Sequence, residues 1–127
     1  GQDRFRSKVG LPLATYFAPV TEALEHIAAY FQALSEPMRL QLINLLRAGE
    51  RNVGELAREC GCTTADASKH LALLAQQGMV ARESRGTSVY YRIADDTIDA
   101  LCDLVCGSLA RQFEQRGQEG AMVNLNR

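Results

Sequence analysis

Several features that mark other protein classes are missing from this 127-residue sequence. It has no tryptophan and only 6% aromatic residues, so aliphatic side chains must form most of a core. No run of about 18 apolar residues occurs, which argues against a membrane-spanning helix. Residues 1–6 contain no hydrophobic signal core, which predicts a cytoplasmic protein. The 14 basic and 15 acidic side chains nearly balance, which excludes a uniformly basic coat protein for nucleic acid.

Cysteine is also scarce, and its spacing is informative. The four cysteines form two close pairs, Cys60 with Cys62 and Cys102 with Cys106. Four cysteines in this spacing do not make a secreted disulfide scaffold. In a reducing cytosol they are thiols that can serve as metal ligands or as redox switches.

Length and composition predict one soluble globular domain. Apolar residues make up 46% of the chain and charged residues 23%, close to the averages for such proteins. Residues 1–17 show no sustained periodicity and are expected to form a loosely ordered arm, while residues 116–127 are polar and predict a frayed tail. The folded domain is therefore placed at residues 18–115.

Apolar periodicity predicts four helices in the first part of that domain. The first covers residues 19–34 and the second residues 37–47, with Ser35 as the expected N-cap of the second. A short third helix covers residues 55–59 and ends at residues 60–61. Thr63 is the expected cap of the fourth, whose core-facing stripe is Ala67, Leu71 and Leu74.

Two β-rich runs and a long helix complete the pattern. Residues 80–83 and 88–93 predict a hairpin, joined by a turn at residues 84–87 that contains Gly86. A last helix is expected from residue 95 to about residue 115. This order predicts a mainly α-helical fold with a small β-hairpin, a winged helix-turn-helix, because a short helix and a tight turn must present the next helix to a DNA major groove.

The outward face of the fourth helix is a candidate DNA-reading surface. Short hydroxyls, a lysine and a histidine lie opposite its apolar stripe, and such side chains suit contacts to bases and phosphates. The distribution of charge along the chain agrees with a DNA contact in this region. Residues 51–93 carry six basic and four acidic side chains, whereas residues 94–127 carry three basic and six acidic ones. The candidate residues are Thr63, Thr64, Ala65, Ser68, Lys69 and His70.

Residues 32–93 resemble the arsenical-repressor (ArsR/SmtB) family of bacterial regulators. The most specific segments are residues 33–40, 68–71 and 78–80, and Arg85-Gly86 followed by residues 90–93. The resemblance implies a homodimer paired through its first and last helices, which represses transcription by binding an inverted-repeat operator and releases it on meeting an inducer. It also implies DNA contacts from the fourth helix and from wing residues. The wing residues are Arg82, Arg85, Gly86, Thr87 and Arg92.

Cys102 and Cys106 are the candidate inducer ligands. Residues four apart on a helix share one face, so two thiolates there can chelate one thiophilic ion such as trivalent arsenic or antimony, cadmium or lead. The alternative is that both are small buried apolar residues, as free cysteines often are. The neighbouring stripe expected to be buried is Ile98, Leu101, Val105, Leu109 and Phe113.

The third ligand that a trivalent metalloid prefers stays open. Candidates are Cys60 or Cys62 of either subunit, a small thiol, or a last-helix cysteine of the second subunit. By this resemblance, the zinc sensors of the family bind zinc with Asp, His, His and Glu of the last helix. Here only Asp95 matches, because Thr97, Ser108 and Arg111 occupy the other three positions. Sulfide sensors use a cysteine of the second helix, which has none here. The family's arsenic site is a Cys-x-Cys pair inside the third helix, whereas residues 60–62 follow it.

The sequence thus predicts a metalloid-responsive repressor, with trivalent antimony or arsenic as the favoured effector and no obligatory cofactor. The alternatives are a dithiol redox or persulfide switch of the same fold and a DNA-binding regulator with inert cysteines. No arrangement of catalytic groups points to an enzyme. Asp99 and Asp103 beside Cys102 should raise its pKa, which is the wrong direction for a nucleophile.

Overall fold

The computed structural model describes residues 20–117, so the arm predicted at residues 1–17 and nearly all of the tail predicted at residues 116–127 lie outside the described residues. The chain divides into two compact units between Glu36 and Pro37. In the first, helix α3 covers Val20–Ala33, as the periodicity predicts. Along residues 20–117, no helix is both long enough and apolar enough to cross a membrane.

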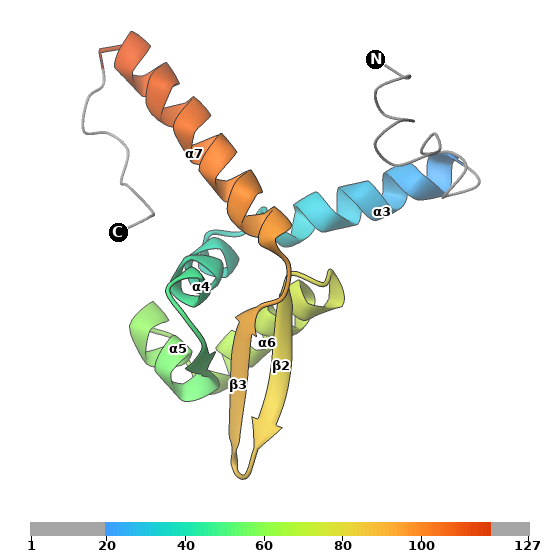
Figure 1. Ribbon diagram of the computed structural model, residues 1–127, viewed down its shortest axis with the longest axis vertical. Coiled ribbons are helices and arrows are strands. Elements are labelled where there is room, and N and C mark those ends of the chain that lie inside the picture. The colour runs from blue at the N-terminus through green and yellow to red at the C-terminus, as the bar shows by residue number, and fades with distance from the viewer. Residues whose placement is uncertain (1–19, 118–127) are drawn as a thin grey trace. The chain divides into compact units, whose positions relative to one another are not determined.

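The second unit contains the predicted winged helix-turn-helix order and one additional strand (Figure 1). Its helices are α4 (Pro37–Arg47), α5 (Val53–Cys60), α6 (Thr64–Gln76) and α7 (Asp96–Gln115), and its strands are β1 (Arg51–Asn52), β2 (Val80–Arg85) and β3 (Ser88–Ile93). Strand β1 was not predicted, because two residues are too short for a periodic pattern. It pairs antiparallel with Tyr90 and Tyr91 of β3, giving the sheet order β1-β3-β2.

Side-chain caps fix the two helices of the helix-turn-helix. The Asn52 side chain accepts a hydrogen bond from the Glu55 amide while the Glu55 carboxylate accepts one from the Asn52 amide, which closes a capping box at the start of α5. Gly61 ends α5 with φ 67°, a left-handed conformation that glycine adopts without a Cβ clash. Thr63 caps α6 as predicted, since its Oγ1 accepts from the Asp66 amide at 3.0 Å.

Two local predictions were wrong. The Ser35 hydroxyl donates to the Gln32 carbonyl at 2.7 Å and so serves the end of α3, while α4 begins only at Pro37. The hairpin turn has two residues rather than four, because Arg85 pairs with Ser88 across it. Gly86 takes φ 61° and Thr87 keeps a negative φ. Glycine at the first of two central turn positions is the arrangement that matches the strand twist.

The core of the second unit lies where α4, α5 and α6 meet the base of the hairpin. Ala67, Leu71 and Leu74 of α6 are each 0% exposed, which confirms the predicted stripe. Burial of this stripe fixes the rotation of α6 and so determines which of its residues face outward. The other buried residues of this core are Leu42, Ile43, Leu46, Leu56, Ala57, Met79, Val80, Tyr91 and Ile98.

The apolar stripe predicted to be buried on α7 is only partly buried in the single chain. Ile98 is buried and Leu101 and Phe113 are half-buried, whereas Val105 is 48% exposed and Leu109 is 37% exposed. Leu104, beside the stripe, is 71% exposed. Burial within one chain was predicted correctly for Ile98 and wrongly for Val105 and Leu109, because periodicity identifies the apolar face of a helix but not the surface that covers it.

Candidate nucleic-acid interface and thiol site

Helix α6 exposes most of the residues predicted to contact DNA on the side opposite its buried stripe. Thr64, Ala65 and Lys69 are exposed and Ser68 is half-buried, while Thr63 caps the helix at the same end. His70 differs, because its Nδ1 lies 3.2 Å from an Arg39 nitrogen of α4. This contact occupies one ring nitrogen of His70 and ties α6 to α4. Its role in DNA contact stays a prediction.

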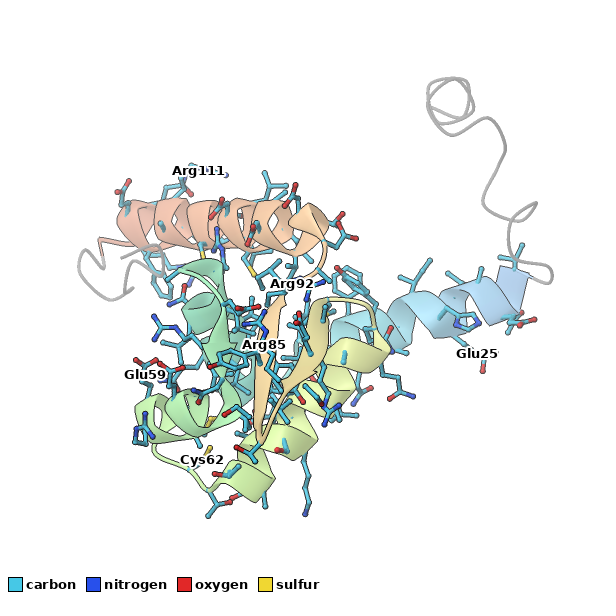
Figure 2. All side chains as sticks on the ribbon, turned by 60° about the horizontal axis from the view of Figure 1, so that its bottom comes forward. Glu25, Glu59, Cys62, Arg85, Arg92 and Arg111 are labelled. Carbon is cyan, nitrogen blue, oxygen red and sulfur yellow. The ribbon has the colours of Figure 1, made fainter. Side chains whose placement is uncertain are left out.

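The hairpin separates the predicted wing arginines onto two faces. Side chains alternate along a strand, and Arg82 pairs with Tyr91 in the β2–β3 register, so both face the same side of the sheet. This is the side that contacts α6. Arg85 and Arg92 belong to the opposite face, together with Glu83 (Figure 2).

Arg85 is already held by two carboxylates. Its guanidinium forms a bidentate pair with Glu50 at 2.7 and 2.8 Å and a second contact with Glu83 at 2.9 Å, and it lies 4.5 Å over the Tyr90 ring. The hydrogen bond from Arg85 and its charge lower the pKa of Glu83. A DNA phosphate must therefore replace these carboxylates to bind Arg85. Sequence reasoning missed Glu50, which is 35 residues away in the chain and carries no local signal.

On α7, an arginine of α4 lies beside the thiol pair. Arg47 Nε is 2.9 Å from Asp99 Oδ1, and Arg47 Nη2 donates to Asp103 Oδ1 at 2.7 Å. Cys102 lies between these two aspartates in the sequence, and Cys106 is one turn further on; both are half-buried. Burial is the main cause that raises the pKa of Cys102, Arg47 opposes it, and Asp103 and Asp99 contribute least. The predicted direction is confirmed, but the main cause is burial.

The second cysteine pair lies elsewhere in the unit. Cys60 ends α5 and Cys62 follows Gly61, and burial together with the neighbouring Cys62 and Glu59 raises the pKa of Cys60. In Figure 2, Cys62 lies at the turn between α5 and α6, well away from α7. Among residues 20–117, no three His, Cys, Asp or Glu side chains are grouped to hold a metal ion. The structure thus describes the Cys60–Cys62 pair apart from the Cys102–Cys106 pair, and a third-ligand role for Cys60 or Cys62 stays a prediction.

Comparison with known proteins agrees with this architecture. The family model described as "Bacterial regulatory protein, arsR family" matches residues 36–82. The HTH-type transcriptional regulator Rv0324 of Mycobacterium tuberculosis is 38% identical over 82 residues, which are 65% of this chain, although the match spans only 36% of that relative's length. A probable mercury resistance operon repressor of Streptomyces lividans is 32% identical over 70% of each chain.

Solved structures give the same result. The crystal structure of M. tuberculosis Rv0081 matches with a TM-score of 0.69 and 30% identity, covering 74% of this chain and 95% of that one. The solution structure of the homodimeric winged helix-turn-helix domain Mb0332 of Mycobacterium bovis matches with a TM-score of 0.67 and 30% identity, covering 83% and 95%. These relatives are transcriptional regulators rather than enzymes. The chain therefore belongs to the arsR family of bacterial regulatory proteins, as a DNA-binding transcriptional regulator with a winged helix-turn-helix.

Proposed function

We propose that this protein is a cytoplasmic homodimeric repressor that binds an inverted-repeat operator and releases it when a thiophilic metalloid or metal ion binds Cys102 and Cys106. Trivalent antimony and arsenic are the favoured effectors. One observation carries the proposal: two half-buried thiols lie one turn apart on the helix whose Asp99 and Asp103 contact Arg47 of α4. A ligand at the thiols thus acts on a helix that ion pairs join to α4, within the same unit as the helix-turn-helix.

Exposed apolar faces on the first and on the last described helix support the homodimer. Leu24 and Phe31 of α3 are 57% and 54% exposed, and Leu104 of α7 is 71% exposed. Contiguous apolar faces of this kind mark interaction surfaces in soluble proteins. The Mb0332 domain is itself described as homodimeric.

A two-fold dimer would place two α6 helices in successive major grooves about 34 Å apart. Phosphate contacts from Lys69 and Arg82 supply affinity that depends on salt, and the α6 side chains read the bases. The operator must then be an inverted repeat, because its symmetry has to match that of the protein.

The chemistry of the thiols favours a thiophilic effector. Burial raises the pKa of Cys102, so the thiol is protonated at neutral pH and metalloid binding must release protons. The S. lividans relative is named for mercury resistance, which is also thiol chemistry. A trivalent ion would take its third sulfur from the second subunit or from a small thiol.

Release requires that the bound ion favour a dimer geometry that fits the operator poorly. A ligand shifts an equilibrium only by its difference in affinity for the two states, and such couplings are typically about 1–3 kcal/mol. The Arg47 contacts offer a route, because an ion at Cys102 changes charge and packing directly beside Asp99 and Asp103.

The test is fluorescence anisotropy of a labelled operator under reducing conditions, with antimonite, arsenite, cadmium, zinc and persulfide added in turn. We expect antimonite or arsenite to release the operator, and the double variant Cys102→Ser/Cys106→Ser to bind DNA without releasing it. The matched variant Cys60→Ser/Cys62→Ser reports on the third ligand, because it loses the response only if that pair contributes a ligand from either subunit. Unchanged release from Cys102→Ser/Cys106→Ser contradicts the proposal.

The same experiment separates the alternatives. A dithiol redox switch, favoured by the closeness of Cys102 and Cys106, responds to oxidant or persulfide but not to antimonite in reductant. A regulator with inert cysteines responds to none of these additions. Stoichiometric antimonite binding that is lost in the double serine variant supports the metalloid proposal.

A further inference from the structure

A cavity lies between helix α6 and the β2–β3 hairpin. It has a volume of about 400 Å³, within the range of small-molecule sites. It is built entirely from the second unit: from α5, α6 and the β2–β3 hairpin. The lining residues are Val53, Ser68, Ala72, Ala75, Arg82, Val89 and Tyr91.

Small side chains on α6 keep this space open. Ser68, Ala72 and Ala75 follow one another at spacings of four and three, so they form one helix face. The hairpin meets α6 closely at its base, where Met79 and Val80 are buried, and beyond that point α6 lines the cavity with serine and alanine. The lining is mainly apolar, which suits the body of an organic ligand.

Two polar groups in this lining have unused hydrogen-bonding capacity. Arg82 forms no ion pair with any other described residue, in contrast to Arg85. Tyr91 is only 4% exposed, and its hydroxyl has no hydrogen-bond partner among residues 20–117. Among the described residues the Tyr91 hydroxyl is not one of the buried polar atoms that lack a partner, so it reaches solvent and can donate to a ligand in the cavity, and a guanidinium beside apolar surface attracts an anion. Ser68 adds a second hydroxyl, and so a third polar group, to the same wall.

We propose that this cavity binds a small organic carboxylate with an apolar body about the size of one ring. The carboxylate would pair with Arg82 and accept hydrogen bonds from Tyr91 and Ser68, while the body lies against Val53, Val89 and Ala72. A free phosphate fits less well, because its strongly hydrated oxygens need more donors than one arginine and two hydroxyls provide.

The position of the cavity gives this ligand a role. Ser68 and Arg82 are also expected DNA contacts, so the carboxylate and the operator compete for the same two side chains. This role rests on the proposed DNA-binding function, whereas binding of the carboxylate to the free protein does not. The cavity thus gives the protein a second effector site that is independent of the cysteines.

The test uses benzoate as the probe and the full chain labelled with ¹⁵N, without DNA. We expect saturable shifts of the amide signals of the lining residues in the millimolar range or tighter. Arg82→Gln should weaken binding about tenfold or more, because a charge-assisted hydrogen bond is lost. Arg92→Gln, which removes the same charge from the opposite face of the sheet, should leave the affinity unchanged.

Two further comparisons keep the proposal falsifiable. Ala72→Leu fills the cavity with a good helix former and should abolish the shifts, and each variant's own spectrum reports whether it is folded. Benzamide, the neutral match of benzoate, should bind at least about tenfold more weakly. Absent or non-saturating shifts, or equal affinity of benzoate for the Arg82→Gln variant, overturn the proposal.

Failure of this site and failure of the proposed function are distinguishable. Benzoate should displace operator DNA from Cys102→Ser/Cys106→Ser, which has no metalloid response. Binding of benzoate to a protein that never responds to metalloids overturns the thiol proposal alone. A metalloid response without benzoate binding overturns the cavity site alone.

Discussion

At the scale of single residues, the surroundings of an arginine decide whether its charge is available to DNA. Arg82 has no counter-ion among the described residues, whereas Arg85 is held by Glu50 and Glu83. From the sequence alone, Arg82 and Arg85 would be expected to contribute equally to DNA binding. Phosphate neutralisation by one free cation changes the slope of binding affinity against salt by about one unit, and a cation that must first leave two carboxylates contributes less.

We therefore predict that Arg82→Ala flattens the slope of log affinity against log salt by about one unit, and that Arg85→Ala flattens it less. The measurement is operator anisotropy over a series of salt concentrations, with a scrambled duplex to show that the loss does not depend on sequence. An Arg85→Ala effect as large as that of Arg82→Ala would show that DNA displaces both carboxylates at little cost.

The reactivity of Cys102 is a second residue-scale prediction. Because burial raises its pKa and thiolate is the nucleophile, alkylation by iodoacetamide at neutral pH should be slow and should accelerate as the pH rises above the ordinary thiol range. Arg47 lowers this pKa, so Arg47→Gln should slow the reaction further. The rates are measured in a chain whose other three cysteines are serine, with Arg111→Gln as the charge-matched control. Faster alkylation of the Arg47→Gln variant would contradict the assigned role of that charge.

At the scale of elements, caps determine where the helix-turn-helix begins and ends. Asn52 and Glu55 satisfy two amides at the start of α5, and Asn52 also belongs to β1. Asn52→Ala should destabilise the protein by about 1 kcal/mol, as the loss of an N-cap usually does. Urea unfolding measures this, and Gln41→Ala on the exposed side of α4 should change the stability by less than about 0.5 kcal/mol. Equal effects of the two substitutions would show that the box adds no stability.

The elements also show what sequence patterns can and cannot predict. Apolar periodicity placed α4, α6 and α7 almost to the residue, because burial of one helix face leaves a repeating signal. Strand β1 was missed, because its two residues are defined by pairing with β3 and not by any local preference. Ser35 was assigned to the wrong helix, since its hydroxyl can serve either the helix before it or the helix after it.

In the candidate site, too, sequence patterns predicted some features and missed others. The residues on the outer face of α6 followed from the stripe Ala67, Leu71 and Leu74, which fixes the rotation of the helix. The contacts of Arg47 with Asp99 and of Arg85 with Glu50 join residues 52 and 35 positions apart. Such pairs depend on the tertiary arrangement, so single-sequence patterns contain no signal for them. The cavity at Arg82 has the same origin.

At the scale of the whole molecule, the apolar face of α7 remains to be explained. Leu104, Val105 and Leu109 are between 37% and 71% exposed. A contiguous exposed apolar patch on a soluble protein usually marks an interaction surface. Cys102 and Cys106 lie on the same helix. A second copy that covers this face would therefore bring its own thiols into the region where a third metalloid ligand is needed.

This arrangement makes Leu104 a test of the assembly. Since Leu104 is 71% exposed in one chain, Leu104→Glu should leave the stability of the subunit nearly unchanged but should prevent dimerisation, because a carboxylate buried in an apolar interface lacks a partner. Sedimentation measures the mass, and operator affinity should fall with it, since one subunit contacts only one half-site. Ala110→Glu adds the same charge to the polar side of α7 and should leave the dimer intact. A Leu104→Glu protein that remains dimeric and binds the operator would place the subunit interface elsewhere and would remove the structural basis for a thiol site shared between two chains.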